Sequence, residues 1–377
     1  MGSMATSRLM RVALAASVSL MALAIPTSAK AQAPPGVTVA YAVFDRQAGA
    51  FVAQQNTTMQ FRSASLVKLL IALDYLWNRG PSYSIPTADK ARLDVMLRSS
   101  DDAAASYYWQ LNGFEQIVNR MVPRLGLQNT APPPPAQHGT WGYTAISAAD
   151  MVRIYRYLLD SAPLPVRDYI MGNLRQSTRC GTDGFDQSFG IPSSFNKPWS
   201  AKQGWSGFGS APPGPCGAAA AAPTAPLAAP AAVDLVKEAL HTSGTVGSGD
   251  RSIVVVLTLH PDGTAFNTAA ATLTQIVRSL PVPGGVLSPP PPPPDGVWFG
   301  TWGSGVHVRA SATTASPVVG TIPAGADVRV SCQIQGQEVV VDPYRNNWWA
   351  YLPDYGGYMT NIYIDYPTNQ LPGVPNC

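Results

Sequence analysis

The stretch FRSASLVKLL, residues 61–70, places Lys68 in a helical pattern that is otherwise almost wholly apolar. Lys68 follows Ser65 by three residues, so the two side chains share one face of a helix and can hydrogen-bond. Such a lysine either packs its stem while the ammonium group reaches water, or serves as the base of a serine nucleophile. Because a Ser-x-x-Lys pattern occurs by chance in most chains of this length, further motifs must decide between these alternatives.

The first residues have the pattern of an export signal. Arg8 and Arg11 precede an apolar run over residues 12–25, and a small-x-small site follows, best cut after Ala31. The run is too short to span a bilayer. We therefore predict a signal peptide over residues 1–31 and a secreted protein, either free or associated with the cell wall.

The charge of the mature chain excludes several classes of partner. Without Arg8, Arg11 and Lys30, 22 of the 25 basic residues remain, and they equal the 22 acidic residues. Binders of nucleic acid or anionic membranes carry a basic excess instead. No later apolar run is long enough to span a bilayer. We expect no nucleic-acid partner and no stable membrane insertion.

Four cysteines in an exported chain predict two disulfides. Of the three possible connectivities, the positions favour Cys180 with Cys216 and Cys332 with Cys377, because a proline-rich break separates the two pairs. The cysteine spacings lack the close pairs of a zinc site, and the four histidines form no ligand cluster. We expect no metal and no other cofactor.

Six consecutive prolines from Pro289 mark the clearest boundary in the chain. Polyproline is extended and cannot join a packed core, so residues 281–296 are predicted to be a linker. It separates a large domain at residues 36–280 from a small one at residues 297–377. The insert at residues 211–232 is low in complexity and predicts a surface loop.

The large domain has strand patterns at both ends and helical patterns between them. This order predicts an α+β fold, in which helices pack on one antiparallel sheet and a helical lobe is inserted. Strands are expected as a pair within residues 37–55 and at 200–207, 237–244 and 251–260, and helices at 87–111, 113–126, 147–160 and 266–280. Ser147 is the expected N-cap of its helix.

Three short motifs follow one another in this domain: Ser65-Leu66-Val67-Lys68, Ser100-Asp101-Asp102 and Lys202-Gln203-Gly204. Acyl transfer by such a set needs a serine activated by an amine, a second hydroxyl that relays the proton, and a cation for the substrate carboxylate. It also needs an oxyanion hole, for which the backbone N–H groups of Ser65 and Trp205 are candidates.

With these motifs in this order, residues 36–280 resemble the penicillin-binding protein and serine β-lactamase superfamily. The initial strand pair, the turn LGLQNT and the helix SAADMVRIYRYLL resemble those of D-alanyl-D-alanine carboxypeptidases. The resemblance implies that Ser65 is the nucleophile, Lys68 the base, Ser100 the proton relay and Lys202 the carboxylate anchor. It implies a serine acyl-transfer enzyme that acts on peptidoglycan peptide, or on a related amide, ester or β-lactam.

Two positions depart from that superfamily pattern. Asp102 stands where an asparagine is usual; its carboxylate can only accept hydrogen bonds and would keep Lys68 protonated. Gln203 stands where threonine or serine is more frequent. The alternative is therefore that the protein has this fold, is catalytically weak or inactive, and binds peptidoglycan.

The loop at residues 125–146 contains no aspartate or glutamate, and His138 is its only group that titrates near neutrality. The common β-lactamases that this chain resembles use a glutamate in this loop to activate the deacylating water. We therefore expect slow deacylation. His241 lies in the predicted strand HTSG and either lies near the cleft or, as we expect, is a buried, hydrogen-bonded strand histidine.

The small domain is rich in aromatic and β-branched residues with regular turn signals, which predicts a small all-β barrel. It resembles bacterial SH3-like domains and is expected to anchor the protein to the cell wall. Its aromatic residues either form an exposed groove for peptide or glycan or fill the core of the barrel; they are Trp348, Trp349, Tyr351, Tyr355 and Tyr358.

Overall fold

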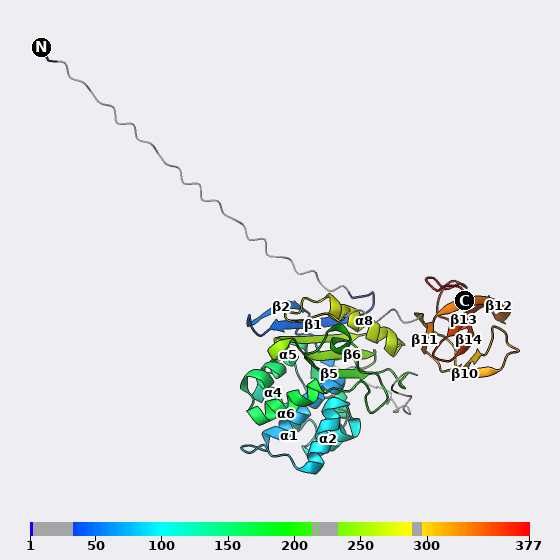
Figure 1. Cartoon of the computed structure of the whole chain (residues 1–377). Helices are drawn as coiled ribbons and strands as arrows, with labels where there is room; N and C mark the ends of the chain where they lie inside the picture. The colour runs from blue at the N-terminus through cyan, green and yellow to red at the C-terminus, as the bar shows by residue number, and fades with distance from the viewer. Residues whose placement is uncertain (3–32, 213–215, 217–232, 289–295) are drawn as a thin grey trace. The chain divides into compact units, whose positions relative to one another are not determined.

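The computed structural model describes residues 1–2, 33–212, 216, 233–288 and 296–377 (Figure 1). Almost all of the predicted signal peptide lies outside the described residues. The same is true of most of the low-complexity insert and of the consecutive prolines in the linker. In the described ranges, no helix combines the length and the apolar character needed to cross a membrane.

A five-stranded antiparallel sheet in the order β2-β1-β7-β6-β5 is the centre of the predicted large domain. The N-terminal strands at its edge are joined by a tight turn, in which the Gln47 N–H donates to Asp45 Oδ1 at 2.9 Å. The other three strands come from the end of the domain. The sheet confirms the predicted strands and consists of β1 (Thr38–Asp45), β2 (Ala50–Gln55), β5 (Trp199–Ser206), β6 (Ala239–Val246) and β7 (Ser252–Leu259).

Both faces of this sheet are covered. Along β7, Ile253, Val255 and Leu257 belong to the core under the helical lobe, whereas Val254 and Val256 belong to the core on the opposite face. Successive side chains of a strand point to opposite faces, so a strand buried on both sides is apolar at every position. This accounts for the uninterrupted apolar run at residues 253–257 within β7.

The predicted helical lobe lies between the two ends of the sheet in sequence, and α8 (Phe266–Ser279) packs on the other face (Figure 1). Ser147 is the N-cap of α5 and accepts from the Asp150 N–H at 3.2 Å, as predicted. The lobe consists of α1 (Lys68–Trp77), α2 (Thr87–Arg98), α3 (Asp102–Leu111), α4 (Gln116–Leu125), α5 (Ala148–Arg156), a π-helical turn at Tyr157–Ser161 and α6 (Leu164–Arg175). The short helix α7 (Ile191–Ser194) packs with α8 on the opposite face.

Residues 296–377 are all-β, but the described strands do not close into the predicted barrel. They form a five-stranded sheet in the order β10-β9-β14-β13-β12 and a separate pair of β11 with β8. The elements are β8 (Val297–Gly300), β9 (Val306–Arg309), β10 (Val318–Ile322), β11 (Asp327–Val330), β12 (Cys332–Val341), β13 (Tyr344–Leu352), β14 (Gly357–Thr360) and a 3₁₀ turn at Asn361–Tyr363.

The predicted aromatic set of this region does not form one exposed surface. Trp349 is buried and its indole N–H donates to the Gln337 carbonyl at 2.8 Å. Tyr355 packs against the apolar core. Tyr351 and Tyr358 are partly buried neighbours on adjacent strands, with ring centroids 5.0 Å apart. Trp349 and Tyr355 therefore belong to the core, as in the second of the two predicted alternatives.

Both predicted disulfides are present and no cysteine is free among the described residues. Cys180–Cys216 joins the segment before α7 to the chain beyond β5. Cys332–Cys377 ties the start of β12 to the C-terminus. Such bonds persist in oxidising surroundings and are typical of proteins outside the cytoplasm.

Candidate active site

Ser65 lies in a 3₁₀ turn, η1 (Ala64–Val67), immediately before α1. Ala64 has φ of 45°, a left-handed conformation that is costly for a residue with a Cβ atom. Two short strands that the sequence did not reveal, β3 (Phe61–Arg62) and β4 (Ala145–Ile146), pair next to this turn. The turn that presents Ser65 is therefore strained and is held by the loop that precedes α5.

Lys68 is the first residue of α1 and is 0% exposed. Its Nζ donates to the Ser100 carbonyl, to Ser100 Oγ at 3.3 Å and to Asp102 Oδ1 at 2.6 Å. These three acceptors match the three N–H groups of an ammonium ion. The expected hydrogen bond between Ser65 and Lys68 is absent from the described residues.

Ser100 lies between α2 and α3 with φ of 58°. The next residue, Asp101, is the N-cap of α3 and accepts from the Ala104 N–H at 2.7 Å. This cap begins the new helix and leaves Ser100 in the break between the two helices. The unusual backbone angle turns both the carbonyl and the hydroxyl of Ser100 toward the lysines.

Lys202 comes from β5 and is 1% exposed. Its Nζ contacts Ser100 Oγ at 2.7 Å and the Gln203 carbonyl at 3.1 Å. Burial lowers the pKa of Lys202 well below 10.5, and the charge of Lys68 lowers it further. Burial also lowers the pKa of Lys68, but the Asp102 carboxylate opposes that shift. Asp102 therefore favours the charge on Lys68, and Lys202 is the better candidate for a neutral amine.

The two residues after Lys202 determine how β5 lies against the serine. Gln203 is buried and its amide donates to the backbone carbonyls of Gln187 and Phe189, so the side chain holds the strand and does not line the opening. A Cβ atom at Gly204 would lie 3.3 Å from the Ser65 nitrogen and 3.1 Å from the Ser63 carbonyl oxygen. Glycine therefore permits close packing of β5 on the turn.

The side chain of Trp205 contacts the carboxylate of Asp183, a residue that the sequence did not single out. The indole N–H of Trp205 donates to Asp183 Oδ2 at 2.8 Å, and Phe185 packs beside the indole ring. Asp183 lies in the sequence CGTDG, three residues after the disulfide cysteine Cys180. Nothing in that sequence predicts a site residue, because the contact is made with a strand some twenty residues further along the chain.

Trp141 is the second site residue without a sequence signal. Its ring lies over the Lys68 Nζ, with 4.6 Å from the nitrogen to the ring centroid. The indole N–H donates to Ser106 Oγ at 3.1 Å, which fixes the ring. The loop before α5 therefore presents an aromatic face to Lys68, and neither carboxylate nor imidazole takes that position.

The two histidines considered from the sequence have separate roles. His241 is buried in β6; its Nδ1 accepts from the Thr258 N–H at 3.2 Å, and its Nε2 lies 2.9 Å from the Arg62 carbonyl. Burial lowers the pKa of His241 to about 4, so it is neutral, as expected for a structural histidine. His138 is exposed, packs its ring on Phe114 and lies 3.3 Å from the Pro135 carbonyl.

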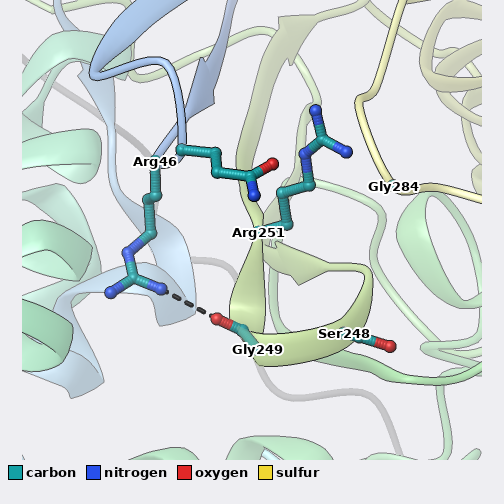
Figure 2. A pocket seen from close by; sticks show the side chains of 6 residues that line it. Arg46, Ser248, Gly249, Arg251 and Gly284 are labelled. Atoms are coloured by element: carbon teal, nitrogen blue, oxygen red, sulfur yellow. Dashed lines mark hydrogen bonds between the residues drawn. The ribbon is translucent and has the colours of Figure 1, made fainter.

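A cavity of about 540 Å³ lies elsewhere, between the β1–β2 turn and the turn before β7. Arg46 and Arg251 line it, but Arg46 points to the Gly249 carbonyl while Arg251 points the other way (Figure 2). Each arginine also pairs with a carboxylate, Asp160 and Asp45 respectively. The two guanidinium groups do not converge on one ligand. In the described ranges, no cluster of three or more potential metal-ligating side chains occurs.

The fold and site define an α+β protein in which Ser100 links two buried lysines at the edge of an antiparallel sheet, and the turn that carries Ser65 packs against the edge strand β5. Similar solved structures include a class A β-lactamase from Mycobacterium abscessus, with 15% identity, a TM-score of 0.46 and coverage of 65% of this chain and 92% of that chain. They also include PBP-A, with 14% identity, a TM-score of 0.47 and coverage of 65% and 89%.

No family model matches the chain. The "Putative lipoprotein LppW" of Mycobacterium bovis is 36% identical over 251 residues, which span 65% of this chain and 70% of that protein. The protein of the same name from Mycobacterium tuberculosis gives the same values. The chain belongs to the family of these mycobacterial LppW proteins.

Proposed function

We propose that the protein is an exported serine acyl-transfer enzyme that acts on cell-wall peptide or a related amide or ester. The observation that carries this proposal is that Ser100 Oγ joins the buried Lys68 and Lys202, while the strained turn that carries Ser65 packs against the strand of Lys202. Lysines are rarely buried this completely, because desolvating each ion costs roughly several kcal/mol. Strained backbone conformations such as that of Ala64 are more frequent at functional sites than elsewhere in proteins.

In the proposed reaction, Ser65 Oγ bonds to the acyl carbon of the substrate and the bond to the leaving group breaks. The serine proton passes to Ser100 Oγ, whose own proton passes to Lys202. Lys202 returns a proton through Ser100 to the departing amine or alcohol. Lys68 stays protonated beside Asp102 and stabilises negative charge near Ser100. The backbone N–H groups of Ser65 and Trp205 bind the developing oxyanion.

The acylation step is tested with a neutral thioester and, separately, with a penicillin. With the thioester, we expect intact mass measurements to show one acyl group per chain, located on Ser65 by peptide mapping and absent in Ser65→Ala. Ser99→Ala is the matched control, because its hydroxyl is next to the site in sequence and only accepts from Thr178 Oγ1. It should acylate like the wild type.

The acyl group should also persist after the free reagent is removed, because Trp141 covers Lys68 with an aromatic ring and the loop offers no carboxylate to activate water. Rapid multiple turnover that survives His138→Ala and disappears in Ser65→Ala would contradict this expectation. An unmodified chain that still binds wall fragments would favour the non-catalytic alternative.

A second function, retention on the cell wall, is favoured by an aromatic cluster in residues 296–377. Trp302 and Tyr344 are exposed, with ring centroids 5.8 Å apart, and Tyr363 lies 5.2 Å from Trp302. Exposed aromatic rings stack on the apolar faces of sugars and peptides at low entropic cost.

We expect Trp302→Ala to weaken retention on isolated cell walls several-fold without changing the rate of acylation at Ser65. Val340→Ala, an exposed apolar residue outside the cluster, serves as the control. Sedimentation of the proteins with purified walls measures the effect. If Trp302→Ala and Val340→Ala are retained equally, the cluster does not bind the wall.

A further inference from the structure

Asp183 is a carboxylate without an ionic partner at the edge of the proposed active site. It accepts from the Trp205 indole N–H at 2.8 Å and from the Phe185 N–H at 3.4 Å, both neutral donors. No lysine or arginine of the described ranges forms an ion pair with it. Partial burial raises the pKa of Asp183, although the indole bond lowers it. A carboxylate in this state gains from a cation that approaches it.

The surrounding chain holds Asp183 in this position. An added Cβ at Gly181 would come within 2.5 Å of Asp183 Oδ1 and 3.0 Å of the Trp205 ring, so glycine is needed for this close contact. The disulfide at Cys180 fixes the start of the segment. Through Trp205, Asp183 is tied to the strand that also supplies Lys202, and its charge acts on both Lys68 and Lys202.

At this site the basic side chains lie in the interior and the acidic side chains lie nearer to the surface. Both lysines are fully buried and their N–H groups are directed to Ser100, Asp102 and the Gln203 carbonyl. The groups nearer to solvent are carboxylates, since the side chain of Asp102 is 60% exposed and Asp183 is partly exposed. The resemblance to carboxypeptidases implied that Lys202 anchors a substrate carboxylate; in the structure its Nζ contacts Ser100 Oγ and the Gln203 carbonyl.

Building on the proposed acyl-transfer function, we propose that Asp183 makes this site select substrates that carry an ammonium group, and not a carboxylate, beside the scissile bond. The substrate class is a peptide or ester whose leaving group bears a free amine. A carboxylate at that place meets the uncompensated charge of Asp183, whereas an ammonium ion compensates it; Asp102 is already paired with Lys68. Penicillins, which carry a carboxylate, are then poor reagents compared with cationic acyl donors.

The test uses two thioesters with the same acyl group, one with cysteamine and one with thioglycolate as the leaving group. Ser65 Oγ forms the ester, the C–S bond breaks, and the serine proton ends on the departing thiol. Rates of thiol release are divided by those of uncatalysed hydrolysis, to remove the intrinsic difference between the two esters. We expect the cysteamine ester to be preferred by about tenfold, as for one favourable charge contact near a surface.

Asp183→Asn keeps an oxygen for the Trp205 N–H but removes the charge, and it should reduce the preference to about twofold. Asp186→Asn is the matched control on the same segment, where the carboxylate pairs with Arg179, and it should leave the preference unchanged. An equal preference in the wild type and in Asp183→Asn would overturn the proposal.

A second measurement separates this proposal from the proposed function. In Ser65→Ala, equilibrium binding of the same two thioesters is measured by calorimetry, with and without Asp183→Asn. Preferential binding of the cysteamine ester that is lost with Asp183→Asn supports the selectivity even if Ser65 never acylates. Equal affinities for the two esters in Ser65→Ala overturn the selectivity, even if Ser65 is acylated in the wild type.

Discussion

Lys202→Met should lower the rate of Ser65 acylation by about 10³-fold, the usual effect of losing a general base. The reason is geometric: the Lys202 Nζ lies 2.7 Å from Ser100 Oγ, while the Lys68 Nζ lies 3.3 Å from it and is engaged by two stronger acceptors. Burial lowers the pKa of both lysines, but only Lys68 has a carboxylate hydrogen-bonded to it that opposes the shift, so Lys202 exchanges the proton and Lys68 keeps its charge. Stopped-flow acylation with a neutral thioester measures the loss.

The pH dependence identifies which lysine is the base. A base acts when deprotonated, so the rate should fall as the pH drops below the pKa of Lys202. The charge of Lys68 lowers that pKa, so Lys68→Met should raise it and move the fall in rate to higher pH. The Asp102 carboxylate raises it, so Asp102→Asn should move the fall to lower pH and speed acylation near neutrality.

The same variants would show if Lys68, and not Lys202, is the base. If Lys68 were the base, Lys68→Met would abolish acylation and Lys202→Met would weaken it only by a few-fold. The opposite order, with a displaced pH profile in Lys68→Met, supports Lys202. Circular dichroism spectra of the variants check that each one folds, since both lysines are buried.

The sheet was predictable because its evidence is local in the sequence. The continuous apolar run of β7 and the turn between β1 and β2 each indicate a strand without knowledge of the rest of the chain. The disulfides were predictable because the proline-rich break leaves one pair on each side. The sequence pattern of residues 296–377 predicted strands but not whether they close into a barrel. The spacing of turns indicates where strands lie, but not which strands pair.

The candidate site was predictable only as a set of residue types. The motifs identified Ser65, Lys68, Ser100 and Lys202, but not the hydrogen bonds between them. Those bonds depend on the positive φ of Ser100, which directs two of its oxygens to the lysines. Trp141 and Asp183 had no motif, because each reaches the site from a loop whose path is fixed by tertiary contacts.

Asp74→Ala should lower the free energy of unfolding by about 1.5–3 kcal/mol, the scale of lost hydrogen bonds to a charged group, because the arginines left behind are partly exposed and can be hydrated. Asp74 lies in α1 and is 0% exposed. Arg120 of α4 binds it with Nε at 2.9 Å from Oδ1 and Nη2 at 2.7 Å from Oδ2, and Arg124 adds a contact at 3.4 Å. Urea denaturation followed by circular dichroism measures the loss.

The matched control is Asp168→Ala, which removes an exposed pair with Arg167 on α6 and should cost less than about 1 kcal/mol. A double variant, Asp74→Leu with Arg120→Met, should recover much of the stability, because apolar side chains of similar size replace a buried pair at little cost. If Asp74→Ala costs no more than the control, the pair between α1 and α4 does not stabilise the helix that begins at Lys68. Ser65 and Lys68 would then owe their placement to the strained turn and to β5, and the acylation rate in Asp74→Ala would equal that of the wild type.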